Sequence, residues 1–334
     1  MRSLAQALTE RPDIELRIFS LNRTVRRRIL TRHEGIEVLF LPQRWPARLD
    51  PLTRFRLRHW ALRKPIRDFS PDVVHGMGFE TGNALVASWL SEKATAFVQG
   101  IVEYLVQLPA DQVSCEIRRM RYCERLAAGR LCGVVAETEF AARWARRRAP
   151  QAWVEVIPHA VRPLFLKAPP AEFPADPVIF VYVGALLKRK GVDLLIRALA
   201  HLPRGGAIRA HLVGDGPERA AFERLASELG ISERVVFRGY LNGESLIQEL
   251  RVCRALVCPS RYDTSPNVIT EAHAVGLPVI ASRVGGIPEM VESGVDGLLV
   301  EDGDVTGLAQ AMNILAGDAR RAAEMGARGR QKVH

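Results

Sequence analysis

Short apolar runs recur along the whole chain and are separated by segments with the period of an amphipathic helix. In the first half these runs predict strands at 14–19, 36–41, 71–75, 95–99, 131–136 and 154–157. In the second half they predict strands at 178–183, 208–213, 235–237, 255–258 and 279–281. Strands that alternate with helices at this spacing indicate doubly wound parallel sheets. We therefore expect an α/β protein.

The chain length and one Pro-rich stretch indicate two domains. A chain of 334 residues is long for one hydrophobic core, because a domain usually takes about 100–200 residues. The segment 166–177 contains Pro169, Pro170 and Pro177, and it separates the two series of strands. We expect an N-terminal domain over 1–165, a linker over 166–177 and a C-terminal domain over 178–334. Both would be Rossmann-like and would face one cleft.

Composition excludes several classes of protein. Apolar residues make up 48% and charged residues 25%, which is ordinary for a globular protein. No run approaches the roughly 20 apolar residues that cross a bilayer, and the first residues are too polar for a signal peptide. The five cysteines are odd in number and form no Cys-x-x-Cys pair, which disfavours zinc and disulfide frameworks. These features predict a cytoplasmic protein.

The net charge of +10 belongs to the N-terminal half. Residues 1–165 contain 27 Lys and Arg against 17 Asp and Glu, whereas residues 166–334 contain 20 of each kind. Such a surface favours an anionic membrane, nucleic acid or acidic substrates. The alternative is that the arginines are simply solvated on helix faces. Nucleic acid is the weaker candidate, because no recognised binding motif accompanies the charge.

The stretch from Pro259 to Gly286 contains the most informative pattern. An apolar strand ends at Pro259, a polar loop contains Asp263, and a short helix carries Glu271 before a second strand leads to Gly285 and Gly286. Loops at the carboxyl ends of parallel strands form ligand crevices, and helix N-termini there attract anions. Ionised carboxylates accept hydrogen bonds, which suits a ligand rich in hydroxyl groups. The alternative is a loop-capping Asp263 and a solvated Glu271.

A second pattern follows the strand at 178–183. Gly184 ends the strand, and Lys188, Arg189 and Lys190 precede the helix that starts near residue 192. Basic side chains beside a helix N-terminus favour a diphosphate, through charge-assisted hydrogen bonds and the helix dipole. The alternative is a solvated basic turn.

These two patterns resemble the family 4 (group 1) glycosyltransferases, which are retaining enzymes with the GT-B fold. The family pattern has Pro-Ser, an acid, seven residues, Glu-Ala, a Gly-x-Pro-Val-Ile segment and Gly-Gly. Glu271 fits this pattern, and Asp263 stands where the family usually has Glu. The resemblance covers nearly the whole chain, and it is strong from about residue 154 onward.

The resemblance also implies roles for particular residues. Asp263 would meet the hydroxyl groups of the transferred sugar, Glu271 the ribose, and Lys190 the leaving diphosphate. Ala185 replaces the usual family arginine, for which Lys188 or Arg189 would substitute. Further contacts to the donor are expected from Gly184, Arg189, Thr264, Ser265, Asn267 and Val268.

In the N-terminal half the resemblance is weaker. His75 is expected to end a strand and to face the crevice, although an ordinary core or rim histidine is an equal alternative. Gln99 stands where the family has a histidine near the reacting centre, and Thr138 fits a strand-end position that is usually Ser or Thr. His159 lies in a segment similar to the family hinge Ile-Pro-Asn-Gly-Val-Asp, and we expect it to hold the linker.

Two further expectations concern metal and the ends of the chain. Asp302-Gly303-Asp304 imitates an Asp-x-Asp metal motif but stands where the family has an ordinary loop, so we predict no metal. Family members begin with a strand and a Gly-Gly loop before the helix that here starts at Met1, and they end with a helix that crosses back onto the N-terminal domain. We therefore expect a fragment that lacks both ends, or a misplaced start codon.

The expected function is transfer of a sugar from a UDP- or GDP-linked donor, with retention and without a cofactor. The acceptor would be a glycan or a lipid-linked glycan, with the basic half on the anionic inner face of a membrane. One alternative is another enzyme of this fold, such as a nucleotide-sugar epimerase or a phosphorylase. A phosphorylase would need a lysine carrying pyridoxal phosphate and a much longer chain. The second alternative is a non-catalytic remnant that still binds nucleotide.

Overall fold

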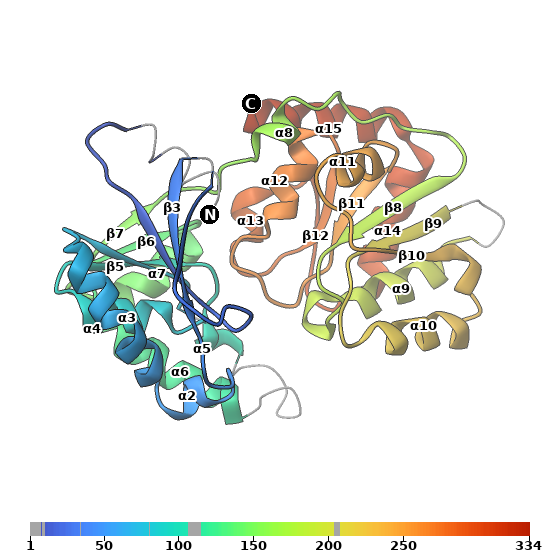
Figure 1. Cartoon of the computed structure of the whole chain (residues 1–334). Coiled ribbons are helices and arrows are strands. Elements are labelled where there is room, and N and C mark those ends of the chain that lie inside the picture. Colours follow the sequence, from blue (N-terminus) through green and yellow to red (C-terminus); the bar gives the residue numbers. More distant parts are fainter. Residues whose placement is uncertain (1–7, 9–10, 34, 80, 106–114, 204–207) are drawn as a thin grey trace. The chain divides into compact units, whose positions relative to one another are not determined.

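The chain divides into two compact units, Met1–Ala160 (unit 1) and Val161–His334 (unit 2). The computed structural model describes residues 8, 11–33, 35–79, 81–105, 115–203 and 208–334 (Figure 1). The division falls after Ala160, five residues before the boundary expected at residue 165. Each unit contains its own sheets and helices, and each is described separately below.

Unit 1 contains two sheets. The strands β4, β5, β6 and β7 form a parallel sheet in that order, and β1, β3 and β2 form a second sheet in which β2 is antiparallel to β3. The strands are β1 Arg17–Asn22, β2 Ile29–His33, β3 Ile36–Pro42, β4 Val74–Met77, β5 Ala94–Val98, β6 Gly133–Ala136 and β7 Trp153–Val156. The helices are α2 Leu49–Leu52, α3 Arg56–Phe69, α4 Asn83–Leu90, α5 Val102–Leu105, α6 Cys115–Ala128 and α7 Glu139–Arg148.

The predicted strands of unit 1 are present, but their arrangement differs from a single parallel sheet. The antiparallel strand β2 was not predicted, because all five of its residues are exposed and its sequence shows no buried face. It is held to β3 by backbone pairing rather than by burial of its side chains. Backbone hydrogen bonds can therefore add a strand that hydrophobic periodicity does not mark.

Buried carboxylates of unit 1 are paired with donors. The Glu124 side chain, 1% exposed, accepts hydrogen bonds from the backbone N–H groups of Val102 and Glu103 at 2.6 and 2.9 Å, where α5 begins. Asp50, also 1% exposed, accepts from Trp45 Nε1 at 2.6 Å and from Arg58 Nε at 2.8 Å. An unpaired buried charge would be costly, so these contacts fix the loops and helices that provide them.

Unit 2 contains one parallel sheet of six strands in the order β10-β9-β8-β11-β12-β13. The strands are β8 Val178–Val183, β9 Ile208–Val213, β10 Val235–Gly239, β11 Ala255–Cys258, β12 Val279–Ser282 and β13 Gly297–Val300. The helices are α8 Pro163–Leu166, α9 Val192–His201, α10 Arg219–Glu228, α11 Gly243–Arg251, α12 Asn267–Ala274, α13 Ile287–Met290, α14 Val305–Gly317 and α15 Ala319–Val333. Single 3₁₀ turns lie at Lys188–Lys190 and Ser232–Arg234.

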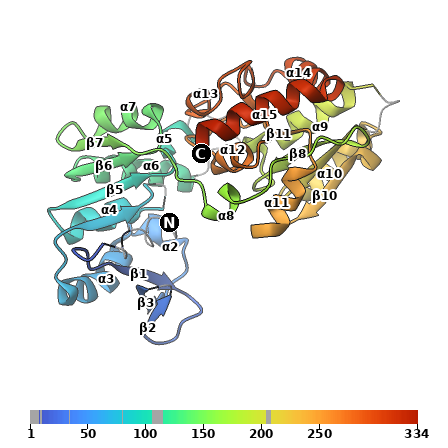
Figure 2. The same ribbon diagram turned by 90° about the horizontal axis from the view of Figure 1, so that it is seen from above.

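The strand order of unit 2 confirms the expected Rossmann-like sheet. One apolar cluster packs α9, α10 and α14 against the sheet, and another packs α8, α11, α12 and α13, so helices cover both faces (Figures 1 and 2). The chain runs outward from β8 through β9 to β10, then returns to β11 on the other side of β8. In such sheets the ligand crevice lies at the carboxyl ends of the strands where this order reverses, which here are β8 and β11.

The segment expected as a linker, 166–177, is part of unit 2. It follows Phe165, which is fully buried in the unit 2 core. Ala171 N donates to Val275 O at 2.7 Å, and Glu172 N donates to Arg251 O at 2.6 Å. The Pro-rich composition suggested a loose connection, but these contacts attach the segment to unit 2.

Arg254 fixes the same segment to the end of α14. Its side chain is 3% exposed, and its guanidinium donates to the carbonyls of Leu315, Ala316 and Pro174 at 2.8–2.9 Å. Helix carbonyls at a C-terminus lack partners within the helix, so a buried cation there satisfies acceptors that would otherwise be unpaired.

We expect Arg254→Met to lower the free energy of unfolding by about 2–3 kcal/mol, because one buried and two partly buried carbonyls lose their donor. The thermal unfolding midpoint measures this. The matched control is Arg320→Met, whose side chain is 88% exposed in a surface pair with Glu324 and should change stability by less than about 0.5 kcal/mol. Equal midpoints for the two variants would contradict the role of Arg254.

Candidate functional site

The loops that follow β8 and β11 meet through one ion pair. Lys190 ends the loop after β8, Asp263 lies in the loop after β11, and Lys190 Nζ is 2.5 Å from Asp263 Oδ2. The two side chains are 21% and 12% exposed. Both predicted residues therefore lie together at the reversal point of the strand order, where Figure 1 shows β8 and β11 side by side.

Gly191 permits this approach of the two loops, and Gly285, in the loop after β12, packs against the second of them. Gly191 has a φ of 71°, and a Cβ there would lie 1.8 Å from the carbonyl oxygen of Pro259. Gly285 has a φ of 58°, and a Cβ there would lie 1.7 Å from the carbonyl oxygen of Asp263, which also accepts from Gly286 N at 3.2 Å. A side chain at either position would displace the backbone. The Gly-Gly motif thus holds the Asp263 backbone in place.

The basic loop is fixed by residues that the sequence did not mark. Arg261 donates to both carboxylate oxygens of Asp193 at 2.8 Å and to Lys188 O at 2.6 Å. Glu218 accepts a hydrogen bond from Lys188 N. In the described part of the chain the side chains of Lys188 and Arg189 have no ion-pair partner, so their charges are available to an anion. Gly184 N donates to Val213 O at 2.9 Å and so continues the ladder of β8.

The helix after Asp263 contains Glu271. Its side chain is 14% exposed, and Oε1 accepts from Arg162 Nη2 at 2.8 Å. Thr264 and Ser265 are buried in the preceding loop, whereas Asn267 is exposed at the first position of α12 and Val268 is half-buried. The structure therefore brings the four predicted donor contacts Thr264, Ser265, Asn267 and Val268 into one loop and the helix that follows it, whereas Gly184 and Arg189 lie after β8. Arg162 adds a cation that the sequence analysis missed.

Burial keeps the other ionisable groups below these loops neutral. Burial raises the pKa of the Tyr182 hydroxyl well above its ordinary value, and the charges of Cys258 and Asp263 act in the same direction. Tyr182 donates to Ala185 O at 2.7 Å. Burial raises the pKa of the Cys258 thiol to about 11. At neutral pH the phenol and the thiol therefore add no charge beside Lys190 and Asp263.

The residues predicted in unit 1 lie in different settings. His75 is the second residue of β4 rather than its end, since the strand continues to Met77, and its Nδ1 is 2.7 Å from Thr95 Oγ1. The expected strand-end placement of His75 is therefore wrong. Gln99 directly follows β5 and is exposed. Thr138 is 4% exposed and caps α7 by accepting from Ala141 N at 3.3 Å.

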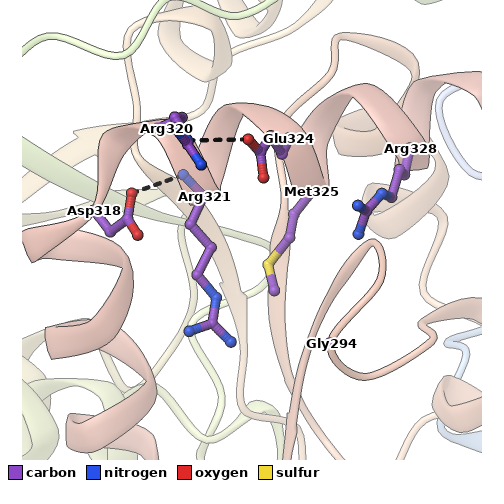
Figure 3. A pocket seen from close by; sticks show the side chains of 7 residues that line it. All are labelled: Gly294, Asp318, Arg320, Arg321, Glu324, Met325 and Arg328. Carbon is purple, nitrogen blue, oxygen red and sulfur yellow. Dashed lines mark hydrogen bonds and ion pairs between the residues drawn. The ribbon is translucent and has the colours of Figure 1, made fainter.

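Two surface features of unit 2 lie outside this site. Asp304, in the Asp-x-Asp sequence, caps α14 by accepting from Gly307 N at 2.8 Å. Figure 3 shows a hollow beside α15, where Asp318 caps the helix and Arg320 pairs with Glu324 at 3.2 Å. The residues that line it are Gly294, Asp318, Arg320, Arg321, Glu324, Met325 and Arg328. None of the predicted site residues lines this hollow.

Comparison with known proteins decides the family. Residues 167–332 match the family "Glycosyl transferases group 1", and residues 1–160 match the "Glycosyl transferase 4-like domain". The chain is 31% identical to the lipopolysaccharide core biosynthesis glycosyltransferase LpsD of Rhizobium meliloti over 80% of the chain and 71% of that protein. The chain belongs to the group 1 glycosyltransferases.

Two further similarities place this glycosyltransferase among its relatives. It is 38% identical, over 46% of the chain and 43% of the relative, to a protein of Mycolicibacterium smegmatis named "GDP-mannose-dependent alpha-(1-6)-phosphatidylinositol monomannoside mannosyltransferase". The solved structure of sucrose-phosphate synthase from Thermosynechococcus elongatus superimposes with a TM-score of 0.86 at 25% identity, over 99% of the chain and 87% of that structure. This likeness confirms the GT-B fold.

Two further facts concern the coverage of the curated relatives and the hydropathy of the helices. The first curated relatives are matched over 36–46% of their own length, so the chain spans less than half of each. Within the described residues of this glycosyltransferase, every helix is too short or too polar to span a bilayer.

We expect Gly285→Ala to abolish measurable nucleotide binding, because the new Cβ would displace the carbonyl of Asp263 and with it the loop after β11. Isothermal titration calorimetry with UDP and GDP measures the binding. Gly303→Ala is the matched control: Gly303 also has a positive φ, of 75°, but a Cβ there would meet nothing within 4 Å. Both variants share the backbone strain of a left-handed residue, so a loss confined to Gly285→Ala isolates the contact with Asp263. Equal affinities would contradict it.

Proposed function

We propose that this protein transfers a sugar from a UDP- or GDP-linked donor to a hydroxyl group of a glycan or lipid-linked acceptor, with retention of configuration and without a metal ion. The observation that carries the proposal is the Lys190–Asp263 ion pair between the loops of β8 and β11. A nucleoside diphosphate sugar offers one partner to each of these groups. Its phosphates suit the ammonium, and its sugar hydroxyls suit the carboxylate.

Donor binding would exchange one set of contacts for another. In the described structure Lys190 and Asp263 neutralise each other, so neither charge is left unpaired in a partly buried place. On binding, Lys190 would turn to the diphosphate and Asp263 to the sugar. As the bond between the anomeric carbon and the phosphate oxygen lengthens, negative charge grows on the diphosphate. Lys190, with Lys188 and Arg189 nearby, would stabilise that charge.

Glu271 and Arg162 would form the nucleoside end of the site. The Glu271 carboxylate is an acceptor for ribose hydroxyls, and the Arg162 contact at 2.8 Å orients it. The buried Thr264 and Ser265 fix the loop between Asp263 and this helix. The relative named as GDP-mannose-dependent supports a nucleoside diphosphate donor.

The test is incubation of the whole chain with a panel of UDP- and GDP-linked sugars, with chromatographic detection of the free nucleoside diphosphate. Release that persists in EDTA supports the metal-independent reaction, and NMR of the product gives its anomeric configuration. Nucleotide binding without release from any donor would favour the non-catalytic alternative. Conversion of one nucleotide sugar into another without release would indicate an epimerase.

We expect Lys190→Ala to lower kcat by about 100-fold while changing the Kd of the donor much less, because the lost interaction strengthens as the diphosphate departs. Steady-state kinetics and calorimetry measure the two quantities. Lys167→Ala, which removes an exposed lysine elsewhere in unit 2, is the control for loss of charge alone. Glu271→Ala should instead weaken nucleotide binding, by about 1–3 kcal/mol. A change in the Kd of the donor alone for Lys190→Ala would refute the proposed role.

We further propose that unit 1 docks on an anionic membrane through one face of α3. The exposed residues of α3 are Arg56, Trp60, Arg63, Lys64, Arg67 and Asp68, and the first five form this face. Their spacing of three and four residues puts them on one side of the helix. Trp60 is 65% exposed, and none of the four cations has an ion-pair partner among the described residues. Cations attract anionic headgroups, and an indole is favourable at the membrane interface.

We expect the chain to sediment with phosphatidylglycerol-containing vesicles and not with phosphatidylcholine vesicles, and high salt should release it. Trp60→Ala and the triple variant Arg63→Gln/Lys64→Gln/Arg67→Gln should each reduce the bound fraction. The triple variant should lower the partition coefficient by at least about tenfold, since each cation contributes about 1 kcal/mol. The control is Arg320→Gln/Arg321→Gln/Arg328→Gln on α15, which removes the same charge from unit 2. Equal binding by the two triple variants would exclude α3 as the docking face.

A further inference from the structure

A buried carboxylate and a histidine meet at the carboxyl edge of the parallel sheet of unit 1. Glu137 directly follows β6, and His159 follows β7 by three residues. Ile157 N donates to Ala136 O at 2.8 Å, which continues the ladder between these strands past their ends. His159 Nδ1 then lies 2.7 Å from Glu137 Oε1. The pair is therefore built on two adjacent strands rather than on a free loop.

The pairing decides which ring nitrogen of His159 faces outward. The Glu137 side chain is 5% exposed, and a buried carboxylate needs a donor. The Nδ1–H group provides that donor, so the neutral imidazole has its proton on Nδ1 and a lone pair on Nε2. The His159 side chain is 26% exposed, and Glu137 is its one recorded partner within the described ranges. In this tautomer, which Glu137 favours, Nε2 is an acceptor on a partly exposed side chain.

The register of the sheet puts Glu137 at the same level as Gln99. Val98 of β5 pairs with Ala136 of β6, and Ala136 pairs with Val156 of β7. The next residues along these strands, Gln99 and Glu137, therefore stand at the same level of the carboxyl edge. This edge is the ligand edge of an open parallel sheet. Gln99 stands where the family resemblance leads one to expect a histidine. The Glu137–His159 pair places an imidazole at the same edge of the sheet, after β7, which is the strand next to β6.

We propose that His159 is a substrate-binding residue whose Nε2 accepts a hydrogen bond from a hydroxyl group of the carbohydrate or polyol acceptor, and that Glu137 is its positioning residue. The inference rests on the proposed transfer reaction. Gln99 stands where the family has a histidine and so provides no imidazole. The proposal assigns the imidazole contact to His159 instead. A hydrogen bond to Nε2 orients the acceptor hydroxyl group, and an oriented hydroxyl group reacts faster than one that meets its partner at random.

A purely structural role for the pair predicts different behaviour. To hold the segment after β7 in place, residue 159 needs only a hydrogen bond to Glu137. The similar family segment has Asn at this position. His159→Asn keeps a side-chain N–H donor for Glu137 and removes the outward acceptor nitrogen. This variant therefore separates the two roles, and the added change Gln99→His restores an imidazole at the neighbouring strand end.

The experiment measures the release of nucleoside diphosphate that depends on an added polyol acceptor, glycerol, which takes the sugar from an active donor of the UDP- and GDP-sugar panel in the presence of the whole chain. We expect His159→Asn to lower turnover by about tenfold or more, with the Kd of UDP or GDP and the thermal midpoint unchanged. Glu137→Gln, which keeps an oxygen for Nδ1–H, should retain more turnover than Glu137→Met. Gln99→His in the His159→Asn background should recover part of the loss. His201→Asn, at an exposed helix end, is the control.

Full turnover in His159→Asn would overturn the inference, and so would a loss that follows a lowered thermal midpoint and is not recovered by Gln99→His. A second measurement needs no activity. In ¹⁵N-histidine NMR of the whole chain at pH 8, the signals that disappear in His159→Asn should show a protonated Nδ1 and an unprotonated Nε2. The reverse tautomer would refute the assignment even if every donor proved inactive. Failure of the donor panel with the expected tautomer would instead count against the proposed function alone.

Discussion

The candidate site depends on the close approach of the backbones of three loops, which follow β8, β11 and β12. Gly191 touches the carbonyl of Pro259, and Gly285 touches the carbonyl of Asp263, at distances that leave no room for a Cβ. Because the main chains meet there, the short side chain of Asp263 reaches Lys190 across the reversal point of the sheet. The ion pair is therefore a consequence of glycine placement, and the position of each charge follows from it.

The charges around this point are arranged to suit an anion with hydroxyl groups. Lys190 and Asp263 balance each other, while burial keeps Tyr182 and Cys258 neutral. The Arg261–Asp193 pair holds the backbone of the basic loop without using the side chains of Lys188 and Arg189. Positive charge is thus concentrated at a fixed backbone, which is the condition for electrostatic stabilisation without reorganisation.

The sequence predicted the strands of unit 2 more accurately than those of unit 1. In unit 2 the predicted strands 178–183, 208–213 and 255–258 coincide with β8, β9 and β11. These strands are central or nearly so, and their apolar runs are bounded by Gly or Pro, which makes them easy to recognise. In unit 1 the exposed strand β2 has no such pattern, and His75 lies inside β4 because the strand continues through Gly76 to Met77. Backbone pairing, which has no side-chain signature, decides such boundaries.

The sequence by itself determined the α/β class and the two-part organisation, because strand periodicity is a local property of the chain. Lys190, Asp263 and Glu271 remain predicted site residues, which the loops and the family resemblance indicated. Only the tertiary structure decided which distant residues meet. Arg162 contacts Glu271 from 109 positions away, and His159 contacts Glu137 from 22 positions away. Such pairs depend on strand order and register, which set where loops end in space. A single sequence marks the residue types of a pair, whereas the fold selects the partners.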